Sequence, residues 1–420
     1  MSDKLKADKV CVIGAGCAGL SAAKALCDQG IDYDQFEAQA DIGGNWAFGI
    51  YDGAHLISSR KTSGFLDYPM PDHLPDFPSR DQVQAYLQDY ASRFGLKDRV
   101  TLNTQVVSVV PVKVDACTKW DVTLHNGQTQ RYHSVVVANG HLWDPVVPEF
   151  EGEFTGKQIH SRNYRHVGDL QGSGILVVGS GNSGCDLVAE AAFAGKQVTL
   201  SMRQGRWFLP KTMFGVPRGD LFIEQLPASQ KEAVLSSLVN VILGNITERG
   251  LPAPDHAFLE KPPTINSLIF HLLEHGRVAI APGIERIDAK TVRFTDATAK
   301  QIDTIVWATG YRTTFPFLDE TIFQWENGVP LRFAGGTMSL GAPGLYFNGL
   351  ASPRGANLPM HSACAQLIAQ CIQTHQVLGD PLFASLAQHS KSVALMDGNV
   401  QDIIGQANAI KERCIQMRLA

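Results

Sequence analysis

The stretch VCVIGAGCAGL, residues 10–20, joins a short apolar run to a glycine-rich turn and the start of an alanine-rich segment. In the pattern GxGxxG the first glycine permits a tight turn, the second lets the backbone approach a pyrophosphate, and the third lets helix and strand pack closely. These positions are Gly14, Gly16 and Gly19. Because the N–H groups at the start of the following helix attract phosphate, we expect Cys17 and Ala18 to line a dinucleotide site.

The residue at the end of the next strand indicates which ribose this site accepts. Residues 31–36 form a predicted strand that ends at Glu37, at about the twenty-residue distance typical of an acid that binds a ribose diol. A carboxylate accepts hydrogen bonds from two hydroxyls and repels a 2′-phosphate. The first site is therefore predicted to bind a dinucleotide without that phosphate.

A second fingerprint follows the apolar run at residues 175–178 and differs at its ribose end. Its strand, turn and helix repeat the first pattern, and its nucleotide-binding residues are predicted to be Gly179, Gly181, Asn182, Ser183 and Gly184. The next strand, residues 197–200, runs into Ser201 and Arg203 with no acid. A hydroxyl and a guanidinium can hold a 2′-phosphate through charge-assisted hydrogen bonds, so this site is predicted to bind NADPH. Two such sites in one chain indicate a flavin, FAD, reduced by a nicotinamide.

Composition excludes several other classes. The chain has 420 residues, enough for two or three domains, and a formal net charge of −5 without a dense basic stretch, which argues against nucleic-acid binding. The polar N-terminus shows no signal peptide, and no apolar run reaches the roughly 18 to 20 residues of a membrane span. We therefore expect a cytoplasmic protein that does not bind membranes.

The spacing of the eight cysteines argues against a redox-active dithiol. No two of them form a CxxC or another short redox-active pair, which a disulfide reductase with two nucleotide sites would need beside its flavin. Histidines and cysteines also lack zinc-ligand spacing, so no metal site is predicted. The electrons of the flavin should go to an acceptor other than a disulfide.

The order of segments predicts an α/β protein with two Rossmann-like dinucleotide-binding domains, the second inserted into the first. We expect the FAD domain to comprise residues 1–154 and 301–420. The NADPH domain should comprise residues 155–300, with a partly helical insertion at about 207–275. A strand is expected at residues 302–307, where the chain returns to the FAD domain.

Between the fingerprints, Phe154, Gly156, His160 and Tyr164 have the spacing FxGxxxHxxxY. With this motif the chain resembles the flavin-containing monooxygenase family. Further matches run along its whole length: GAGCAGL (14–20) with Glu37, Gly43-Gly44-Asn45-Trp46, GSGNSGCD (179–186), SMRQGRW (201–207) and Ala308-Thr309-Gly310-Tyr311. The related Baeyer–Villiger monooxygenases have Trp where this chain has Tyr164, which favours the branch that oxygenates amines and sulfides.

The resemblance implies a mechanism and further site residues. NADPH would reduce FAD, O2 would add at flavin C4a, and the hydroperoxide would oxygenate a soft nucleophile such as a tertiary amine, a thioether or indole. The cofactor performs the difficult step, so the protein supplies orientation and dryness. His160 and Tyr164 belong to the family motif, and a homodimer is expected. The residues expected to contact FAD, besides the first fingerprint, are Gly44, Asn45, Trp46, Val107, Thr309, Gly310 and Asn357.

The chain departs from the family in two places. Where relatives carry an Asn beside the flavin, this chain reads Ile57-Ser58-Ser59-Arg60, so Ser58 or Ser59 is the candidate catalytic side chain near C4a. Ser362, Cys364 and Gln366 occupy the helix positions where relatives show Glu, Gln and Arg. Three alternatives therefore stay open: an NADPH oxidase or flavin reductase that releases H2O2, a Baeyer–Villiger monooxygenase, and a non-catalytic flavin redox sensor.

Overall fold

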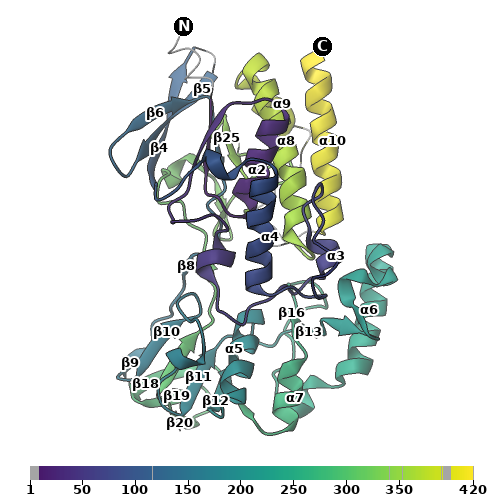
Figure 1. The fold of residues 1–420 in the computed structure, drawn as a ribbon. Helices are drawn as coiled ribbons and strands as arrows, with labels where there is room; N and C mark the ends of the chain where they lie inside the picture. The colour runs from purple at the N-terminus through teal and green to yellow at the C-terminus, as the bar shows by residue number, and fades with distance from the viewer. Residues whose placement is uncertain are drawn as a thin grey trace.

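Two α/β units make up the computed structural model, which describes residues 9–115, 117–339, 341–351, 353–388, 390 and 399–419. They lie one above the other in Figure 1, joined at the short strand β8 (Asp144–Pro145), and both termini lie at the outer end of the upper unit. Each unit is built on a five-stranded parallel sheet. This arrangement confirms the predicted fold class of two Rossmann-like domains.

The first sheet contains the N-terminal fingerprint. Its strands pair in parallel in the order β25 (Leu345–Phe347), β7 (Ser134–Val137), β1 (Val10–Ile13), β2 (Tyr33–Phe36) and β3 (Val100–Thr101). The strands β1, β7 and β25 are buried throughout, as expected for a parallel sheet covered on both faces. Strands from both ends of the chain therefore share one sheet.

Helices from both ends of the chain pack together over this sheet. The fingerprint helix α2 (Cys17–Asp28) packs against α8 (Asn357–Leu378), which in turn packs against the C-terminal helix α10 (Val400–Leu419). Figure 1 shows α2, α8 and α10 as neighbouring helices that run roughly along the long axis of the molecule. The helix α8 thus connects the fingerprint helix to the C-terminal helix.

The first unit also contains the helix α4 (Arg80–Arg93), and its sequence explains where it begins. Ser79 accepts the N–H of Gln82, and the Gln82 side chain accepts the N–H of Ser79, which completes a capping box. The irregular stretch before it contains only a four-residue helix, α3 (Arg60–Ser63).

The second sheet contains the other fingerprint. Its parallel strands follow the order β10 (Lys157–His160), β21 (Thr304–Trp307), β11 (Gly174–Val178), β12 (Gln197–Ser201) and β17 (Val278–Ala281). The fingerprint helix is α5 (Asn182–Phe193). A smaller sheet beside it contains β20 (Ala299–Gln301), β19 (Thr291–Phe294), β18 (Ile284–Ala289) and β9 (Glu151–Phe154).

Strand pairing corrects the predicted domain boundaries at 154 and 301. The strand β9 pairs with β18, so residues 151–154 belong to the second unit. The strand β21 pairs with β10 and β11 and lies inside the second sheet, so the chain returns to the first unit only after Trp307. Sequence alone could not show this, because the apolar strand β21 fits either parallel sheet and the short, polar strand β9 (Glu-Gly-Glu-Phe) carries no pattern that selects its partner.

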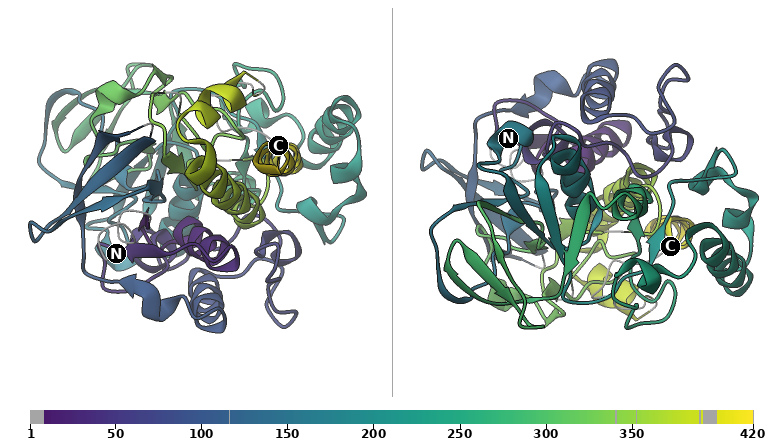
Figure 2. Two further views of the ribbon diagram at one scale, coloured as in Figure 1. Left: turned by 90° about the horizontal axis from the view of Figure 1, so that it is seen from above. Right: turned by 90° about the horizontal axis from the view of Figure 1, so that it is seen from below.

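The predicted insertion contains short strands and two helices. Its elements are β13 (Phe208–Leu209), β14 (Thr212–Met213), β15 (Val216–Pro217), α6 (Ala228–Leu243), β16 (Thr264–Ile265) and α7 (Leu268–Glu274). The helix α7 packs on α5, whereas α6 stands at one edge of the molecule in both views of Figure 2. The insertion therefore reaches the second fingerprint directly.

The remaining elements complete the first unit. A three-stranded antiparallel sheet comprises β4 (Val106–Val114), β5 (Cys117–Leu124) and β6 (Thr129–Tyr132). The short elements are β22 (Tyr311–Arg312), which pairs with β8, β23 (Trp325–Glu326), β24 (Val329–Pro330) and α9 (Pro381–Ala387). Within the described ranges, none of the helices combines the length and hydropathy that crossing a bilayer requires.

Candidate active site

The two glycine turns have the same backbone geometry. Gly14 and Gly179 have φ angles of +102° and +106°, in the region that favours glycine. A Cβ on Gly14 would overlap the carbonyl oxygen of Ala138, and one on Gly179 would overlap that of Ala308. Ala138 follows β7 and Ala308 follows β21, so each turn passes the end of the neighbouring strand in the same way.

The third glycine of each fingerprint brings the helix against the turn. A Cβ on Gly19 would overlap the carbonyl oxygen of Gly14, and a Cβ on Gly184 would overlap that of Gly179. No side chain fits at either position. This close approach fixes the start of each helix directly above the end of its strand.

The middle glycines are open, and this is where a pyrophosphate fits. A Cβ on Gly181 would meet nothing within 4 Å, and one on Gly16 would come no closer than 3.5 Å, to the Cα of Gly44. Neither α2 nor α5 has a side-chain cap or an acidic residue in its first turn. Their first N–H groups are therefore available to an anion, and the residues present fit two dinucleotides.

Glu37 lies where the first site needs its ribose-binding acid. It is buried at the end of β2; Oε2 accepts the N–H of Ala15 at 2.7 Å, and Oε1 accepts the N–H of Gln39 at 2.9 Å. These bonds hold the carboxylate against the glycine turn. The strand end and the fingerprint thus form one site, as expected from their spacing.

The turn after Glu37 lies against the fingerprint too. Gly44 has a φ of +57°, and a Cβ there would come 3.0 Å from the Cα of Gly16. Asn45 starts a π-helical turn and donates from Nδ2 to the carbonyl of Leu142 at 3.1 Å, while Trp46 packs on the first core. Of the other predicted FAD residues in this unit, Val107 is the bulged residue of β4 and 43% exposed, and Asn357 is the exposed first residue of α8.

Thr309 and Gly310 lie at the second fingerprint rather than the first. They follow β21, and the N of Thr309 lies 3.8 Å from the Cβ position of Gly179. The Thr309 hydroxyl donates to the carbonyl of Val146. The backbone N–H of Val146 in turn donates to the carbonyl of Gly310 at 3.0 Å. Because β21 belongs to the second sheet, the end of this strand lies at the crossover between the units, and the FAD contact expected for this pair stays a prediction.

His160 holds this crossover in place. Its Nδ1 accepts the N–H of Arg162 at 3.1 Å, so Nε2 carries the proton and donates to the carbonyl of Gly310 at 3.2 Å. Desolvation lowers the pKa of His160, which favours this neutral form. The ring also packs edge-on against Tyr311. The motif histidine therefore positions the crossover.

Tyr164 is a buried packing residue of the second unit. Its side chain is fully buried, its hydroxyl donates to Glu190 Oε2 on α5 at 2.8 Å, and its ring packs edge-on against Tyr51. The Tyr51 hydroxyl donates to Asp186 Oδ2 at 2.8 Å, also on α5. The tyrosines thus attach the motif segment and the first unit to the second fingerprint helix.

At the second ribose position the structure separates Arg203 from Ser201. Ser201 is buried and its hydroxyl donates to the carbonyl of Pro282 at 2.7 Å, so this side chain braces the strand end instead of facing a ligand. Arg203 is exposed just beyond β12. Asn182 uses Oδ1 to accept the N–H of Ile265 at 2.8 Å, and Ser183 bonds to Tyr51, so both offer backbone N–H groups to a nucleotide.

Ser58 and Ser59 are already engaged. Ser58 Oγ lies 2.7 Å from the Oγ of Ser63. Ser59 is buried, caps α3 and donates to Asp220 of the insertion. A free hydroxyl beside the flavin was expected from the sequence, which does not show that a short helix begins here. Ser58 instead bonds to the end of α3, and Ser59 fixes the contact between α3 and the insertion.

Sequence reasoning missed a polar cluster at the start of α8. There Asn348 and His361 are buried between β25, α2 and α8, and His361 has no hydrogen-bond partner at either ring nitrogen. Gln366, expected on the flavin-facing side, instead accepts from Lys411 of α10 at 3.3 Å. The only available signal was a histidine two residues after Pro359, which no pattern distinguishes from a core histidine.

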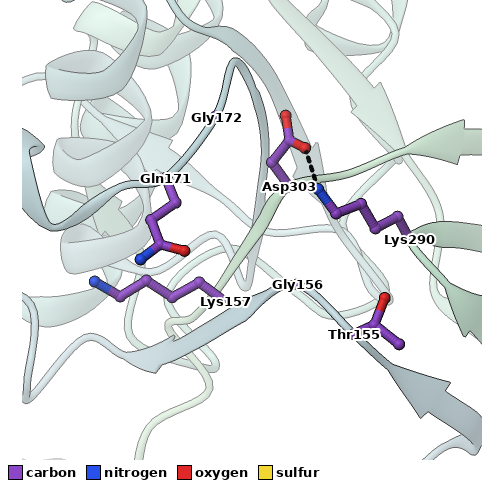
Figure 3. A pocket seen from close by; sticks show the side chains of 7 residues that line it. All are labelled: Thr155, Gly156, Lys157, Gln171, Gly172, Lys290 and Asp303. Carbon is purple, nitrogen blue, oxygen red and sulfur yellow. Dashed lines mark hydrogen bonds and ion pairs between the residues drawn. The ribbon is translucent and has the colours of Figure 1, made fainter.

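One pocket lies outside the nucleotide sites. A surface pocket of about 370 Å³, lined by Lys157, Gln171 and the Lys290–Asp303 ion pair, opens at the amino ends of β10 and β11 (Figure 3), opposite the fingerprint edge. Among the described residues, no group of three or more His, Cys, Asp or Glu side chains is placed to bind a metal ion.

Sequence comparison identifies relatives along most of the chain. Residues 7–393 match the profile of the FMO-like family, described as flavin-binding monooxygenase-like. Flavin-containing monooxygenase 5 of Rattus norvegicus is 33% identical over 383 residues, which cover 84% of this chain and 71% of that protein. Dimethylaniline monooxygenase [N-oxide-forming] 2 of the same species is 32% identical, covering 84% and 70%.

Solved structures with low sequence identity share the fold. The flavin-containing monooxygenase from Stenotrophomonas maltophilia aligns with a TM-score of 0.69 at 22% identity, over 88% of this chain and 99% of that one. The closed form of cyclohexanone monooxygenase aligns with a TM-score of 0.73 at 16% identity, over 97% of each chain. The two-sheet architecture is thus common to enzymes with different substrates.

A profile match over nearly the whole chain and relatives above 30% identity agree with the two nucleotide cradles. The chain belongs to the flavin-binding monooxygenase-like family, NADPH-dependent enzymes whose cofactors are FAD and NADPH.

Proposed function

We propose that this enzyme uses NADPH and O2 to oxygenate a soft nitrogen or sulfur nucleophile, such as a tertiary amine or a thioether. The observation that carries this proposal is the crossover at Thr309-Gly310, where Val146 N donates to Gly310 O at 3.0 Å. It ties the segment leaving the first sheet to the end of β21 beside the second fingerprint. A nicotinamide bound at the second site would then reach a flavin bound at the first.

The choice of nitrogen or sulfur has two supports. Tyr164 stands where Baeyer–Villiger relatives carry Trp. In addition, one relative at 32% identity is named as an N-oxide-forming dimethylaniline monooxygenase. Such substrates bring their own lone pair, so the site needs no strong base. Ketones, by contrast, would give esters.

FAD, when bound, supplies the activation of O2, and the residues of the chain bind, orient and exclude water. The insertion performs the last task. Ser59 donates to Asp220, and Lys211 contacts the Nε2 of His55, so two bonds close the insertion over the segment before α3. Burial also lowers the pKa of Lys211, consistent with a dry interface.

A second candidate function, release of H2O2, is favoured by the state of Ser58 and Ser59. The Ser59 hydroxyl donates to Asp220, and the Ser58 hydroxyl already bonds to Ser63, so the side chains that stand where relatives carry an Asn have partners within the protein. The side chain of the neighbouring Ile57, 36% exposed, has no hydrogen-bond donor. Without such a donor the enzyme would lose oxygen as peroxide and act as an NADPH oxidase.

Product analysis tests both candidates. The purified holoenzyme is incubated with NADPH, O2 and trimethylamine, methyl phenyl sulfide or indole, and NADPH oxidation, H2O2 and oxygenated product are measured together. We expect one substrate to give product for most of the NADPH consumed. H2O2 equal to NADPH with every substrate would establish the oxidase instead. If a ketone is added as substrate, formation of an ester would indicate a Baeyer–Villiger enzyme. If NADPH is not oxidised at all, the protein would be a redox sensor.

The assembly and location also stay predictions. A homodimer is proposed from the family resemblance, and analytical ultracentrifugation checks it. The cytoplasmic location expected from the sequence also stays a proposal. Cell fractionation tests that location.

A further inference from the structure

Two arginines follow the motif histidine at the carboxyl end of β10, and both are partly buried. Arg165 makes three hydrogen bonds to backbone carbonyls. Its Nη2 donates to Phe48 O at 2.6 Å, and its Nη1 donates to Ile50 O at 2.9 Å and to Arg162 O at 3.2 Å. Because Phe48 and Ile50 belong to the first unit, Arg165 has a structural role in joining the two units.

Arg162 is bonded far less. Its Nη1 donates to the carbonyl of Leu142 at 3.3 Å, a carbonyl that also accepts from Asn45 Nδ2 at 3.1 Å. Within the described ranges, Arg162 makes no other side-chain hydrogen bond and no ion pair. A guanidinium has five N–H donors, so most of those of Arg162 stay available. Since the residue is partly exposed, a ligand can reach them from solvent.

The guanidinium of Arg162 lies between the two nucleotide sites. On one side, Nη1 is 3.2 Å from the Cβ position of Gly49, the last residue of the π-helical turn Asn45–Gly49 that follows Gly44 at the first fingerprint. On the other side, β10 pairs with β21, which pairs with the fingerprint strand β11. The carboxyl ends of these parallel strands form the edge at which open α/β sheets bind dinucleotides.

The strand order indicates which half of NADPH passes Arg162. The fingerprint strand β11 has β12 on one side and β21, then β10, on the other. Arg203, the predicted ligand of the 2′-phosphate, lies beyond β12, so the adenosine half is expected on that side. With the pyrophosphate at the start of α5, the other half must extend across the ends of β21 and β10. That is the side on which Arg162 lies.

We propose that Arg162 binds the nicotinamide half of NADPH at the crossover between the units. This half consists of a phosphate, a ribose and a carboxamide-bearing ring, and each of these parts offers oxygen acceptors to a guanidinium. The proposal depends on NADPH as the coenzyme and not on the substrate that is oxygenated. It gives the family motif a residue that contacts the coenzyme, in addition to the positioning roles of His160 and Tyr164.

The ionisable rings beside Arg162 do not balance its charge. Desolvation lowers the pKa of His160, and the charge of Arg162 lowers it further, against the hydrogen bond to Gly310. Desolvation raises the pKa of Tyr311. Both rings are therefore uncharged near neutral pH, and the third neighbour, Arg165, is another cation. An anionic ligand would supply the missing counter-charge.

The experiment compares the whole coenzyme with its adenosine half. The FAD-containing holoenzyme is titrated calorimetrically with NADP and with adenosine 2′,5′-bisphosphate, which keeps the 2′-phosphate but lacks the nicotinamide half. The variants are R162A and R162Q, since glutamine removes the charge and can still donate to Leu142. Two matched controls are R203A and R312A. Arg312 is a cation at the same crossover, but it is paired with Asp144 at 3.3 Å.

We expect R162A and R162Q to bind NADP about tenfold more weakly while their affinity for the bisphosphate stays within about twofold of wild type. R203A should weaken both ligands by the same factor, because both carry the 2′-phosphate. R312A should weaken neither. The melting temperature and the FAD content of the two Arg162 variants should match those of wild type.

Unchanged NADP affinity in R162A would overturn the proposal. So would full NADP affinity in R162Q, because the bond to Leu142 would then explain any loss in R162A. Equal weakening of NADP and the bisphosphate, or loss of FAD, would show that Arg162 acts on the fold or on the first site. The titrations use oxidised coenzyme and form no product, so they can fail while the proposed oxygenation holds, and the reverse.

Discussion

The two nucleotide sites of this protein have glycine turns of the same geometry but differ in the residue at the end that faces the ribose. Both turns have a first glycine near φ +100°, an open middle glycine and a third glycine pressed on the first. At the ribose end one has a buried acid, Glu37, and the other an exposed cation, Arg203. Backbone sterics impose the turn, and therefore it recurs; we propose that the charge of the side chain at the ribose end selects the nucleotide.

The cradles also differ in what covers them. The first is closed by α8, which comes from the C-terminal part of the chain, through Asn348 and Ser21. The second is closed by the insertion: the hydroxyl of Thr264 donates to Ser180 O, and Ile265 N donates to Asn182. Two sites with similar local sequences are thus covered by unrelated segments of the chain.

The largest expected effect comes from the third glycines. In G19A or G184A the new methyl group overlaps a backbone carbonyl that cannot move without opening the turn. We expect each to reduce the free energy of unfolding by roughly 3 kcal/mol or more and to lose its own nucleotide. Chemical denaturation checks the first expectation, and nucleotide content checks the second. A stable G184A would show that the two turns are not equivalent.

The middle glycines should separate binding from stability. Gly16 and Gly181 have φ angles of −75° and −70°, which alanine adopts, and the added methyl meets no close protein atom. We expect G16A to weaken FAD, and G181A to weaken NADP, by about 100-fold, with melting temperatures of the nucleotide-free proteins within about 2 °C of wild type. Calorimetric titration checks this. A large loss of stability would mean that these turns are tighter than they are in this structure.

Arg203 should decide between NADPH and NADH. In R203A the 2′-phosphate loses a charge-assisted contact, so KM for NADPH should rise by about 10- to 100-fold while KM for NADH changes less than about twofold. Steady-state kinetics with both coenzymes measures the ratio. Equal increases for the two coenzymes would remove Arg203 from the phosphate site.

Ser201 provides the smallest effect and the matched control. Its hydroxyl donates to Pro282 rather than to a ligand. S201A should therefore change KM for NADPH by less than about twofold and lower the free energy of unfolding by about 1 kcal/mol, the typical value of one hydrogen bond. An NADPH-specific rise as large as that of R203A would restore Ser201 as a phosphate ligand.

Much of the fold followed from local patterns. The strands on both sides of each fingerprint begin and end within a few residues of their predicted positions because apolar runs and the glycines that follow them are local features. Errors arose where several segments compete for one sheet. The strands β9 and β21 were assigned to the wrong unit because local sequence does not encode which distant strand becomes the partner: β21 lies between β10 and β11, and β9 pairs with β18.

Within the site, the same distinction holds. Residues whose role depends on backbone geometry, such as Gly16 and Gly181, were identified from spacing alone. Residues whose role depends on a distant partner were not: Ser59 bonds to Asp220, and Thr309 bonds to Val146 at the crossover. The unpartnered ring of His361 is visible only when β25, α2 and α8 are in contact.

The sequence by itself determined the two glycine turns, their order and the charges that follow them, since each depends on residues within about thirty positions of one another. Only the tertiary structure decided which strands complete each sheet, and that Cys371 and Cys414, which form no short motif, lie with their sulfur atoms 3.6 Å apart between α8 and α10. It also decided that one buried histidine has a partner and another has none. The physical reason is that turns are governed by local sterics, whereas burial and hydrogen bonding depend on segments that meet only when the chain is folded.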